Sequence, residues 1–321
     1  THALFYDKVE FKNLGLVVID EQHRFGVQQR SRLAEKGYNT DMLLMSATPI
    51  PRSLALSLYG DMDLSFLKSK PKGRKEIITR VMSDKKAPDI LLSAKSAIEK
   101  GDKIYWICPL VEEQEKSDLK AVETRYKEFQ QYFGTDKVAM IHGQMDSSTK
   151  ENAFAKFKEG DAKILVATTV IEVGVDVPDS TIIVIEQAER FGLAQLHQLR
   201  GRVGRSELQS KCVLLYTSYK VNEVSLARLD VMRSSNDGFY IAEQDLKIRG
   251  AGDLVGIKQS GLPNFQFVNL REHYDLLKIA NKDAKCIIAK DPYLASNRGR
   301  RLQLLLKIFD YDLAAIIKNI S

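Results

Sequence analysis

Short apolar runs alternate along the chain with polar segments that have the spacing of helices. The runs fall at residues 14–20, 42–46, 103–108, 138–142, 163–167, 181–186 and 211–216. Their apolarity is continuous rather than alternating, which indicates strands covered on both faces, as in parallel sheets. Residues 118–133 and 147–157 have helical length and spacing, and Asp146 or Ser147 can cap the second helix. Alternating strands and helices predict an α/β fold with doubly wound parallel sheets.

This pattern changes at two places along the chain. Proline, glycine and positive charge interrupt it at residues 70–74, and the strand-like runs stop after about residue 219. Helical spacing then continues in three segments, separated by a glycine-rich stretch: 222–235, 271–290 and 298–320. We therefore predict three domains, at residues 1–72, 73–220 and 221–321, the last of them mainly helical.

Composition and charge narrow the possible classes of protein and of binding partner only slightly. Of the 321 residues, 44% are hydrophobic and 28% charged, as in an ordinary globular protein. A net charge of +6 allows a polyanionic partner, but lysine and arginine are spread along the chain. Three widely separated cysteines without metal-ligand spacing fit reduced thiols in the cytoplasm. No apolar stretch approaches the ~20 residues that span a bilayer, so we expect no membrane partner.

Polar residues whose side chains can take part in binding or catalysis follow several of the predicted strands. Asp20 and Glu21 come after one strand, Ser46 after the next, and His142 and Thr168 after two later ones. Ligands of open α/β sheets bind at these carboxyl ends. An acidic pair there can hold Mg²⁺ and polarise the water that attacks a γ-phosphate, although a solvated turn is the commoner explanation of such a pair.

A stronger signal is the segment QLRGRVGR at residues 198–205. Arg202 and Arg205 are three residues apart, so we predict that they share one helical face and neutralise charge on a transferring phosphoryl group. A merely solvated helix has no use for the glycines between them, which can let the backbone approach phosphates. The threonine-rich segment at 166–176 can bond a phosphate or approach a ribose, but an ordinary turn explains it equally well.

Taken in order, four segments resemble motifs II, III, V and VI of superfamily 2 helicases: DEQH at 20–23, SAT at 46–48, VATTVIEVGVD at 166–176 and QLRGRVGR at 198–205. Longer stretches, DEQHRFGVQQ at 20–29, SATPIPRSLAL at 46–56 and FGLAQLHQLRGRVGR at 191–205, look like the bacterial ATP-dependent DNA helicase family RecG. Arg228 and residues 236–261 resemble the translocation motif that this family shares with the transcription-repair coupling factor. The resemblance covers essentially the whole chain, more loosely after about residue 264.

The resemblance implies a two-domain motor that holds ATP in the cleft between RecA-like domains while DNA crosses both. Residues 1–72 would be the C-terminal half of motor domain 1, residues 73–220 motor domain 2, and residues 221–321 the helical translocation region. In the first domain, Asp20 would bind Mg²⁺, partly through water, and Glu21 would activate the hydrolytic water. Three further residues would link the nucleotide state to DNA contacts: His23, Ser46 and Thr48.

In the second domain, the resemblance places Gly174 and Asp176 near the nucleotide and Thr168 on the DNA backbone. The residues that would close over the triphosphate are Gln198, Arg202 and Arg205.

The translocation motif is matched by Arg228, Arg249 and Gln259, and in this family a helical hairpin and loop turn ATP hydrolysis into movement on duplex DNA. Ala251 stands where the family usually has proline, which leaves the stiffness of that loop open.

One expected element is missing from the sequence. No G-x-x-x-x-G-K-[ST] phosphate-binding loop occurs in it. Residues 1–4 lack an initiator methionine and look like the remains of a DNA-contacting motif, so we expect a piece of a longer protein whose preceding half carries that loop. We expect the 321 residues alone to be inactive, and the intact protein to be a cytoplasmic monomer that uses ATP and Mg²⁺ on branched DNA in recombination and repair.

Two alternatives stay open at this point. A duplex translocase like the transcription-repair coupling factor shares the translocation motif, but its motif II normally has a second acid where this chain has Gln22. A non-catalytic nucleic-acid-binding module fits the missing phosphate loop, but it would not need Asp20 and Glu21 together with Arg202 and Arg205. A RecA-like scaffold used only for protein contacts is the third and weakest alternative.

Overall fold

The computed structural model describes most of the chain in separate stretches: residues 2–6, 8–21, 25–26, 29, 32–33, 35–38, 40–48, 63–67, 69, 71–109, 115–168, 177–249 and 273–309, with the side chains of 2, 115–120, 249, 274 and 277 left out. Contacts divide it into two units, residues 1–49 with 67–255, and residues 50–66 with 256–321. The predicted three-domain division remains a prediction.

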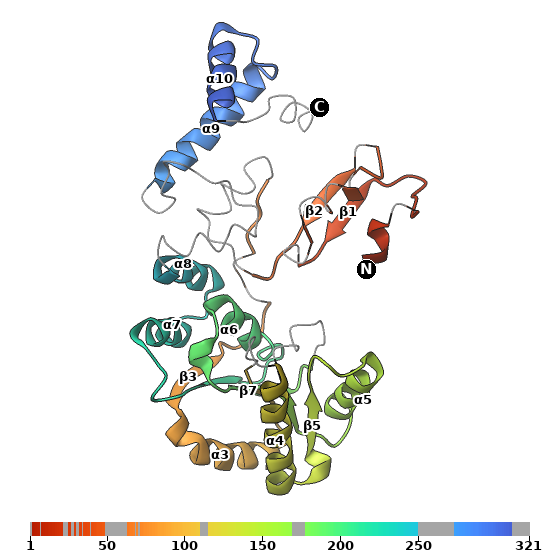
Figure 1. The fold of residues 1–321 in the computed structure, drawn as a ribbon, viewed down its shortest axis with the longest axis vertical. Coiled ribbons are helices and arrows are strands. Elements are labelled where there is room, and N and C mark those ends of the chain that lie inside the picture. Colours follow the sequence, from red (N-terminus) through yellow and green to blue (C-terminus); the bar gives the residue numbers. More distant parts are fainter. Residues whose placement is uncertain are drawn as a thin grey trace. The chain divides into compact units, whose positions relative to one another are not determined.

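The larger sheet belongs to the first unit and is wholly parallel (Figure 1). Its strands are β3 (Ile78–Ser83), β4 (Lys103–Ile107), β5 (Val138–Ile141), β6 (Ile164–Ala167), β7 (Ser180–Ile185) and β8 (Lys211–Tyr216). Their spatial order is β3-β8-β7-β4-β6-β5, so helical crossovers must carry the chain over both faces. The predicted doubly wound α/β fold is therefore confirmed.

Helices cover both faces of this sheet. The helices are α3 (Ala87–Glu99), α4 (Glu115–Phe133), α5 (Ser147–Lys158), α6 (Leu193–Arg200), α7 (Glu223–Ser234) and α8 (Gly238–Arg249), with short 3-10 turns η3 (Asp84–Lys86), η4 (Thr135–Lys137) and η6 (Ala188–Arg190). One core cluster packs α3 and α4 on one face, and the other packs α5 to α8 on the opposite face. All residues of β4 and β6 are buried, as their continuous apolarity predicts.

A smaller parallel pair precedes this sheet in the chain. Strands β1 (Leu16–Ile19) and β2 (Asp41–Leu44) follow the 3-10 helix η1 (His2–Phe5). Val17 and Ile19 are buried, whereas Leu16, Val18 and Leu43 on the other face are exposed. The prediction that these two strands are covered on both faces is therefore wrong for the described part of the chain, because only one of their faces has packing partners there.

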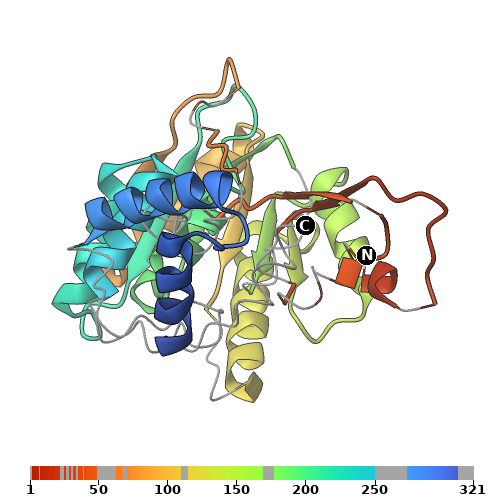
Figure 2. The same cartoon turned by 90° about the horizontal axis from the view of Figure 1, so that it is seen from above.

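The described residues of the second unit include helices α9 (Tyr274–Lys290) and α10 (Asn297–Ile308), which are blue in Figures 1 and 2. The turn between them is tightly bonded. Asp291 accepts the N–H groups of Ala295 (2.8 Å) and Ser296 (3.0 Å), and Ser296 caps α10 by accepting the N–H of Gly299 at 3.0 Å. A hydrogen bond from the Ser296 side chain, together with those from the Ser296 and Ala295 N–H groups, lowers the pKa of Asp291.

Candidate functional site

The predicted residues of the first domain emerge side by side from β1 and β2. Ile19 pairs with Leu44, and the N–H of Met45 donates to the Ile19 carbonyl at 2.8 Å. Because these strands are parallel neighbours, the segments that begin at Asp20 and Ser46 leave the same carboxyl edge. The structure thus brings the predicted magnesium-binding and coupling segments together.

Backbone geometry at Asp20 and Glu21 is unusual for ordinary residues. Glu21 has a positive φ of 49°, a backbone conformation that residues other than glycine adopt at an energetic cost. The Asp20 carboxylate accepts the Glu21 N–H at 2.8 Å. Such strain is often found at functional sites. Within the described ranges no cluster of three or more His, Cys, Asp or Glu can hold a metal. Mg²⁺ needs only one or two carboxylates when phosphates complete its shell, so this acidic pair fits a nucleotide-borne Mg²⁺.

Ser46 and Thr48 form a self-bonded turn directly after β2. The Ser46 hydroxyl accepts the Thr48 N–H at 3.2 Å and lies 3.1 Å from the Thr48 hydroxyl. The turn is thus held by hydrogen bonds of its own two side chains.

A second polar edge lies at the carboxyl ends of β5 and β6. The Thr168 N–H donates to the Ile141 carbonyl at 3.3 Å, which places Thr168 beside His142. Thr168 is 0% exposed, and in the described part of the chain neither its hydroxyl nor His142 Nδ1 has a hydrogen-bond partner. Burial lowers the pKa of His142, an effect that Glu123 opposes and Lys150 reinforces. This edge therefore offers two buried, unsatisfied polar groups to an incoming ligand.

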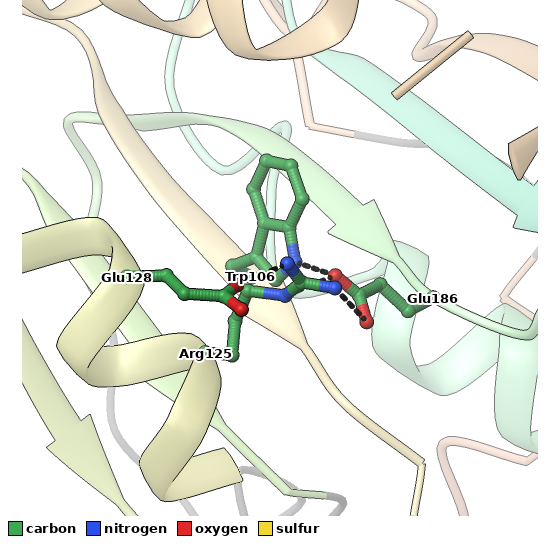
Figure 3. Close-up of polar contacts among 4 residues, drawn as sticks. All are labelled: Trp106, Arg125, Glu128 and Glu186. Atoms are coloured by element: carbon green, nitrogen blue, oxygen red, sulfur yellow. Dashed lines mark hydrogen bonds and ion pairs between the residues drawn. The ribbon is translucent and has the colours of Figure 1, made fainter. Parts of the chain in front are cut away.

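Four side chains join β4, β7 and α4 at the same edge of the sheet (Figure 3). The Trp106 indole donates to Glu186 Oε1 at 2.7 Å, and Arg125 Nε lies 2.8 Å from the same oxygen. Arg125 also bridges to Glu128 at 2.6 Å and has a raised pKa, because the two glutamates outweigh its burial. Trp106 is not among the residues singled out from the sequence, so this polar role of its indole was not predicted.

The QLRGRVGR segment departs from its predicted geometry. Helix α6 ends at Arg200, and Gly201 closes it by donating to the His197 carbonyl at 3.0 Å. Arg202 lies in the following turn, and Arg205 comes after Gly204 and donates from Nε to the Gly201 carbonyl at 3.1 Å. The prediction that Arg202 and Arg205 share a helical face is therefore wrong, because the helix ends before either residue.

Gly204 has a structural reason to be glycine. Its φ is +75°, and a Cβ built on it would lie 2.8 Å from Ile77 Cγ1, just before β3. The chain therefore turns tightly against the start of the sheet here. The glycine shapes the arginine-bearing turn, which is a different role from the predicted approach to phosphates.

Helices α6, α7 and α8 pack against one another, so the segment with the candidate arginines and the predicted translocation motif are in direct contact (Figure 1). Arg228 lies on α7 and is half-buried. Arg249 is the last residue of α8, and its side chain lies outside the described part, as do all atoms of His23, Gly174, Asp176 and Gln259. Gln198 is half-buried on α6.

Two of the three free cysteines are buried beside charged groups. Burial raises the pKa of Cys212 to about 12, although Arg200 works against the shift. Burial and Glu186 also raise the pKa of Cys108. Both are structural, unreactive thiols. In the ranges that the structure describes, no helix has both the length and the apolarity of a membrane span.

Comparison with known families agrees with the order of the motifs. Residues 1–56 match the DEAD/DEAH box helicase family, residues 85–207 the helicase conserved C-terminal domain, and residues 235–309 domain 3, C-terminal, of the ATP-dependent DNA helicase RecG.

Curated relatives support the same assignment. The chain is 49% identical over 317 residues to the ATP-dependent DNA helicase RecG of Aquifex aeolicus, covering 97% of this chain and 40% of the relative. It is 47% identical to RecG of Staphylococcus aureus, covering 90% of this chain and 42% of the relative. The chain therefore spans about two fifths of these relatives.

Solved structures lead to the same group. The structure of RecG bound to a three-way DNA junction matches with a TM-score of 0.66 and 42% identity, over 86% of this chain and 35% of that one. The DUF1998 helicase MrfA bound to DNA and AMPPNP matches with a TM-score of 0.51 over 80% of this chain and 44% of that one, and its 14% identity indicates a shared fold only. The resemblance to RecG helicases and their RecA-like fold is confirmed.

Proposed function

We infer that this chain, which by sequence and fold belongs with the RecG helicases, is one part of an ATP-driven motor that acts on branched DNA. The observation that carries the proposal is the match over 86% of the chain to RecG in a structure with a three-way DNA junction. Stalled forks and Holliday junctions in recombination and repair are the substrates we propose for the intact protein. We propose that it works as a monomer in the cytoplasm.

Asp20 and Glu21 supply the acidic side of the proposed ATP site. Their carboxylates follow β1 directly, where Asp20 can hold Mg²⁺, partly through water, and Glu21 can orient and deprotonate the attacking water. Mg²⁺ bound with ATP would neutralise charge on the phosphates. Ser46 and Thr48, on the neighbouring strand end, are suited to pass the nucleotide state to DNA contacts, and we propose the same role for His23.

The second domain would supply the opposite side of the proposed ATP site. We propose that Gln198, Arg202 and Arg205 bind the triphosphate, and that the arginines stabilise charge in the transition state. The other proposed contacts are Gly174 and Asp176 for the nucleotide, Thr168 for the DNA backbone, and Arg228, Arg249 and Gln259 for translocation. Support for the last group comes from the packing of α7 and α8 on α6.

A longer polypeptide is part of the proposal. The chain spans about two fifths of its curated relatives. Leu16, Val18 and Leu43 leave an apolar face of the β1–β2 pair exposed, and a sheet face of this kind is normally covered. We propose that the remainder of motor domain 1, with the phosphate-binding loop, covers this face.

ATP hydrolysis by three proteins tests the proposal: the full-length protein, its Glu21→Gln variant and the 321-residue chain. We expect DNA-stimulated hydrolysis in the full-length protein only, with nucleotide binding retained by Glu21→Gln. Steady-state hydrolysis by the 321-residue chain would refute the requirement for the preceding half. A full-length protein that binds DNA but hydrolyses no ATP would refute the motor.

A further inference from the structure

Two buried charged residues flank helix α6, and both are bonded to the same neighbouring segment. Glu189 lies in η6, just before the helix, and Arg200 is its last residue. They are only 7% and 2% exposed. Charged side chains are rarely buried to this extent without specific partners, so their partners indicate what they hold in place.

Glu189 holds the beginning of α7. Its main-chain carbonyl accepts the Ser225 hydroxyl at 3.3 Å, and Ser225 lies in the first turn of α7. Its carboxylate accepts the N–H of Thr217 at 3.1 Å, at the end of β8. The segment that leads into α6 is therefore fastened both to the sheet and to α7.

Arg200 holds the end of α7. Its Nη1 lies 2.8 Å from the carbonyl of Met232, 2.8 Å from that of Ser235, and 3.3 Å from the Thr79 hydroxyl. The carbonyls at a helix C-terminus carry partial negative charge, which compensates a buried guanidinium. Because the beginnings and the ends of α6 and α7 are joined pairwise, the two helices run side by side in the same direction.

A third link joins the segments that follow the two helices. Asn236, just after α7, donates from its side chain to the Ile77 carbonyl at 3.2 Å. Gly204, after α6, packs against the side chain of the same Ile77. The turn that carries Arg202 and Arg205 and the connection into α8 therefore both contact Ile77, the residue just before β3.

We propose that Glu189 and Arg200 are positioning residues that clamp α7 to α6, so that a displacement of the turn with Arg202 and Arg205 moves the α7–α8 pair. The proposal rests on the motor function proposed above and assigns its transmission to the Arg200 side chain and to the Glu189 main-chain carbonyl, whose residue is anchored to the sheet by its carboxylate. Neither residue needs to touch nucleotide or DNA. With the clamp in place, α6 and α7 move together as one rigid body and do not slide past each other.

Arg200→Lys in the full-length protein is the main test. Lysine keeps the positive charge, but its side chain is shorter than that of arginine, so its ammonium ends short of the position from which Nη1 contacts all three acceptors. We expect DNA-stimulated ATP hydrolysis to stay near the wild-type rate, while the base pairs unwound per ATP fall by about tenfold, within the range of about 2- to 30-fold for loss of one coupling contact. Arg233→Lys is the matched control, because Arg233 lies exposed on α7 and, among the residues that the structure describes, bridges to Asp230 of the same helix alone.

A second pair of variants tests the other end of the clamp without removing a charge. Ser225→Ala deletes the hydroxyl that reaches Glu189, whereas Ser234→Ala deletes a hydroxyl that donates to Val231 within α7 at 3.1 Å. We expect unwinding per ATP to fall about two- to threefold in Ser225→Ala, the lower range for such a contact, and to stay unchanged in Ser234→Ala.

Equal unwinding per ATP in Arg200→Lys and wild type would overturn the clamp. A parallel loss of ATP hydrolysis and unwinding in Arg200→Lys would also overturn it, because that result indicates a purely structural residue. If Arg200→Lys does not fold, the serine pair decides, and equal values for the two serine variants would overturn the clamp. A wild-type protein without hydrolysis or unwinding would refute the motor function instead, which separates the two failures.

Discussion

Substituting Gly204 by alanine tests the account of the arginine-bearing turn. Gly204 has a φ of +75°, and the space beside its Cα is already occupied by Ile77. An added Cβ would lie 2.8 Å from Cγ1 and 3.0 Å from Cδ1 of Ile77. The left-handed conformation costs an alanine about 1–2 kcal/mol. Forcing a methyl group into a packed site adds about 1–3 kcal/mol. We therefore expect Gly204→Ala to lower the free energy of unfolding by about 2–5 kcal/mol.

Gly101→Ala separates the two contributions. Gly101 has a φ of +96°, but nothing lies within 4 Å of the position of an added Cβ. Only the conformational cost of about 1–2 kcal/mol applies to it. In a unit of this size, the full effect at Gly204 corresponds to a Tm lowered by about 4–20 °C. Urea unfolding and scanning calorimetry of both variants measure the difference, and a Gly204→Ala variant no less stable than Gly101→Ala would refute the packing argument.

Three further substitutions test other parts of the site. Arg202→Ala in the full-length protein should lower the kcat of ATP hydrolysis by about 10³-fold or more, because an arginine at a transferring phosphoryl group contributes that much; an unchanged kcat would remove Arg202 from the site. His142 has a pKa below 6.5 in the folded protein, so the unfolded chain binds more protons and the free energy of unfolding falls as pH drops through about 6.5. Urea unfolding should show a smaller loss of stability at acid pH in His142→Gln than in wild type. An identical loss in the two proteins would contradict the lowered pKa of His142. Trp106→Phe removes the indole hydrogen bond to Glu186 and should cost about 1–3 kcal/mol by circular dichroism, whereas a cost below about 0.5 kcal/mol would show that the bond adds nothing.

The strands of the larger sheet could be predicted where burial is complete. Apart from an initial lysine, runs 103–108 and 163–167 contain no charged residue, and the strands within them, β4 and β6, have every residue buried. Strand β3 was missed because its exposure alternates at the edge of the sheet, where polar residues interrupt the apolar pattern. Helical spacing singled out neither α3 nor α8, and a helical hairpin in the region of α8 was expected only from the resemblance.

The candidate site was predicted from its motifs rather than from its geometry. Spacing correctly placed Asp20 and Ser46 at strand ends, but it could not show that α6 stops at Arg200. A signal for the burial of Arg200 was present, because it follows Leu193 and Leu196 at helical intervals of three and four, on their face of the helix. Glu189 gave no such signal, since only the fold brings it to Thr217 and Ser225.

Fork unwinding by the full-length protein and its Arg249→Ala variant tests the central claim most directly, because it separates ATP hydrolysis from movement. Arg249 ends α8, the helix that packs on α6, and belongs to the segment that resembles the translocation motif. The account predicts DNA-stimulated hydrolysis in both proteins and loss of fork unwinding in the variant. Unchanged unwinding by Arg249→Ala would contradict the proposal that this region turns ATP hydrolysis into movement along DNA.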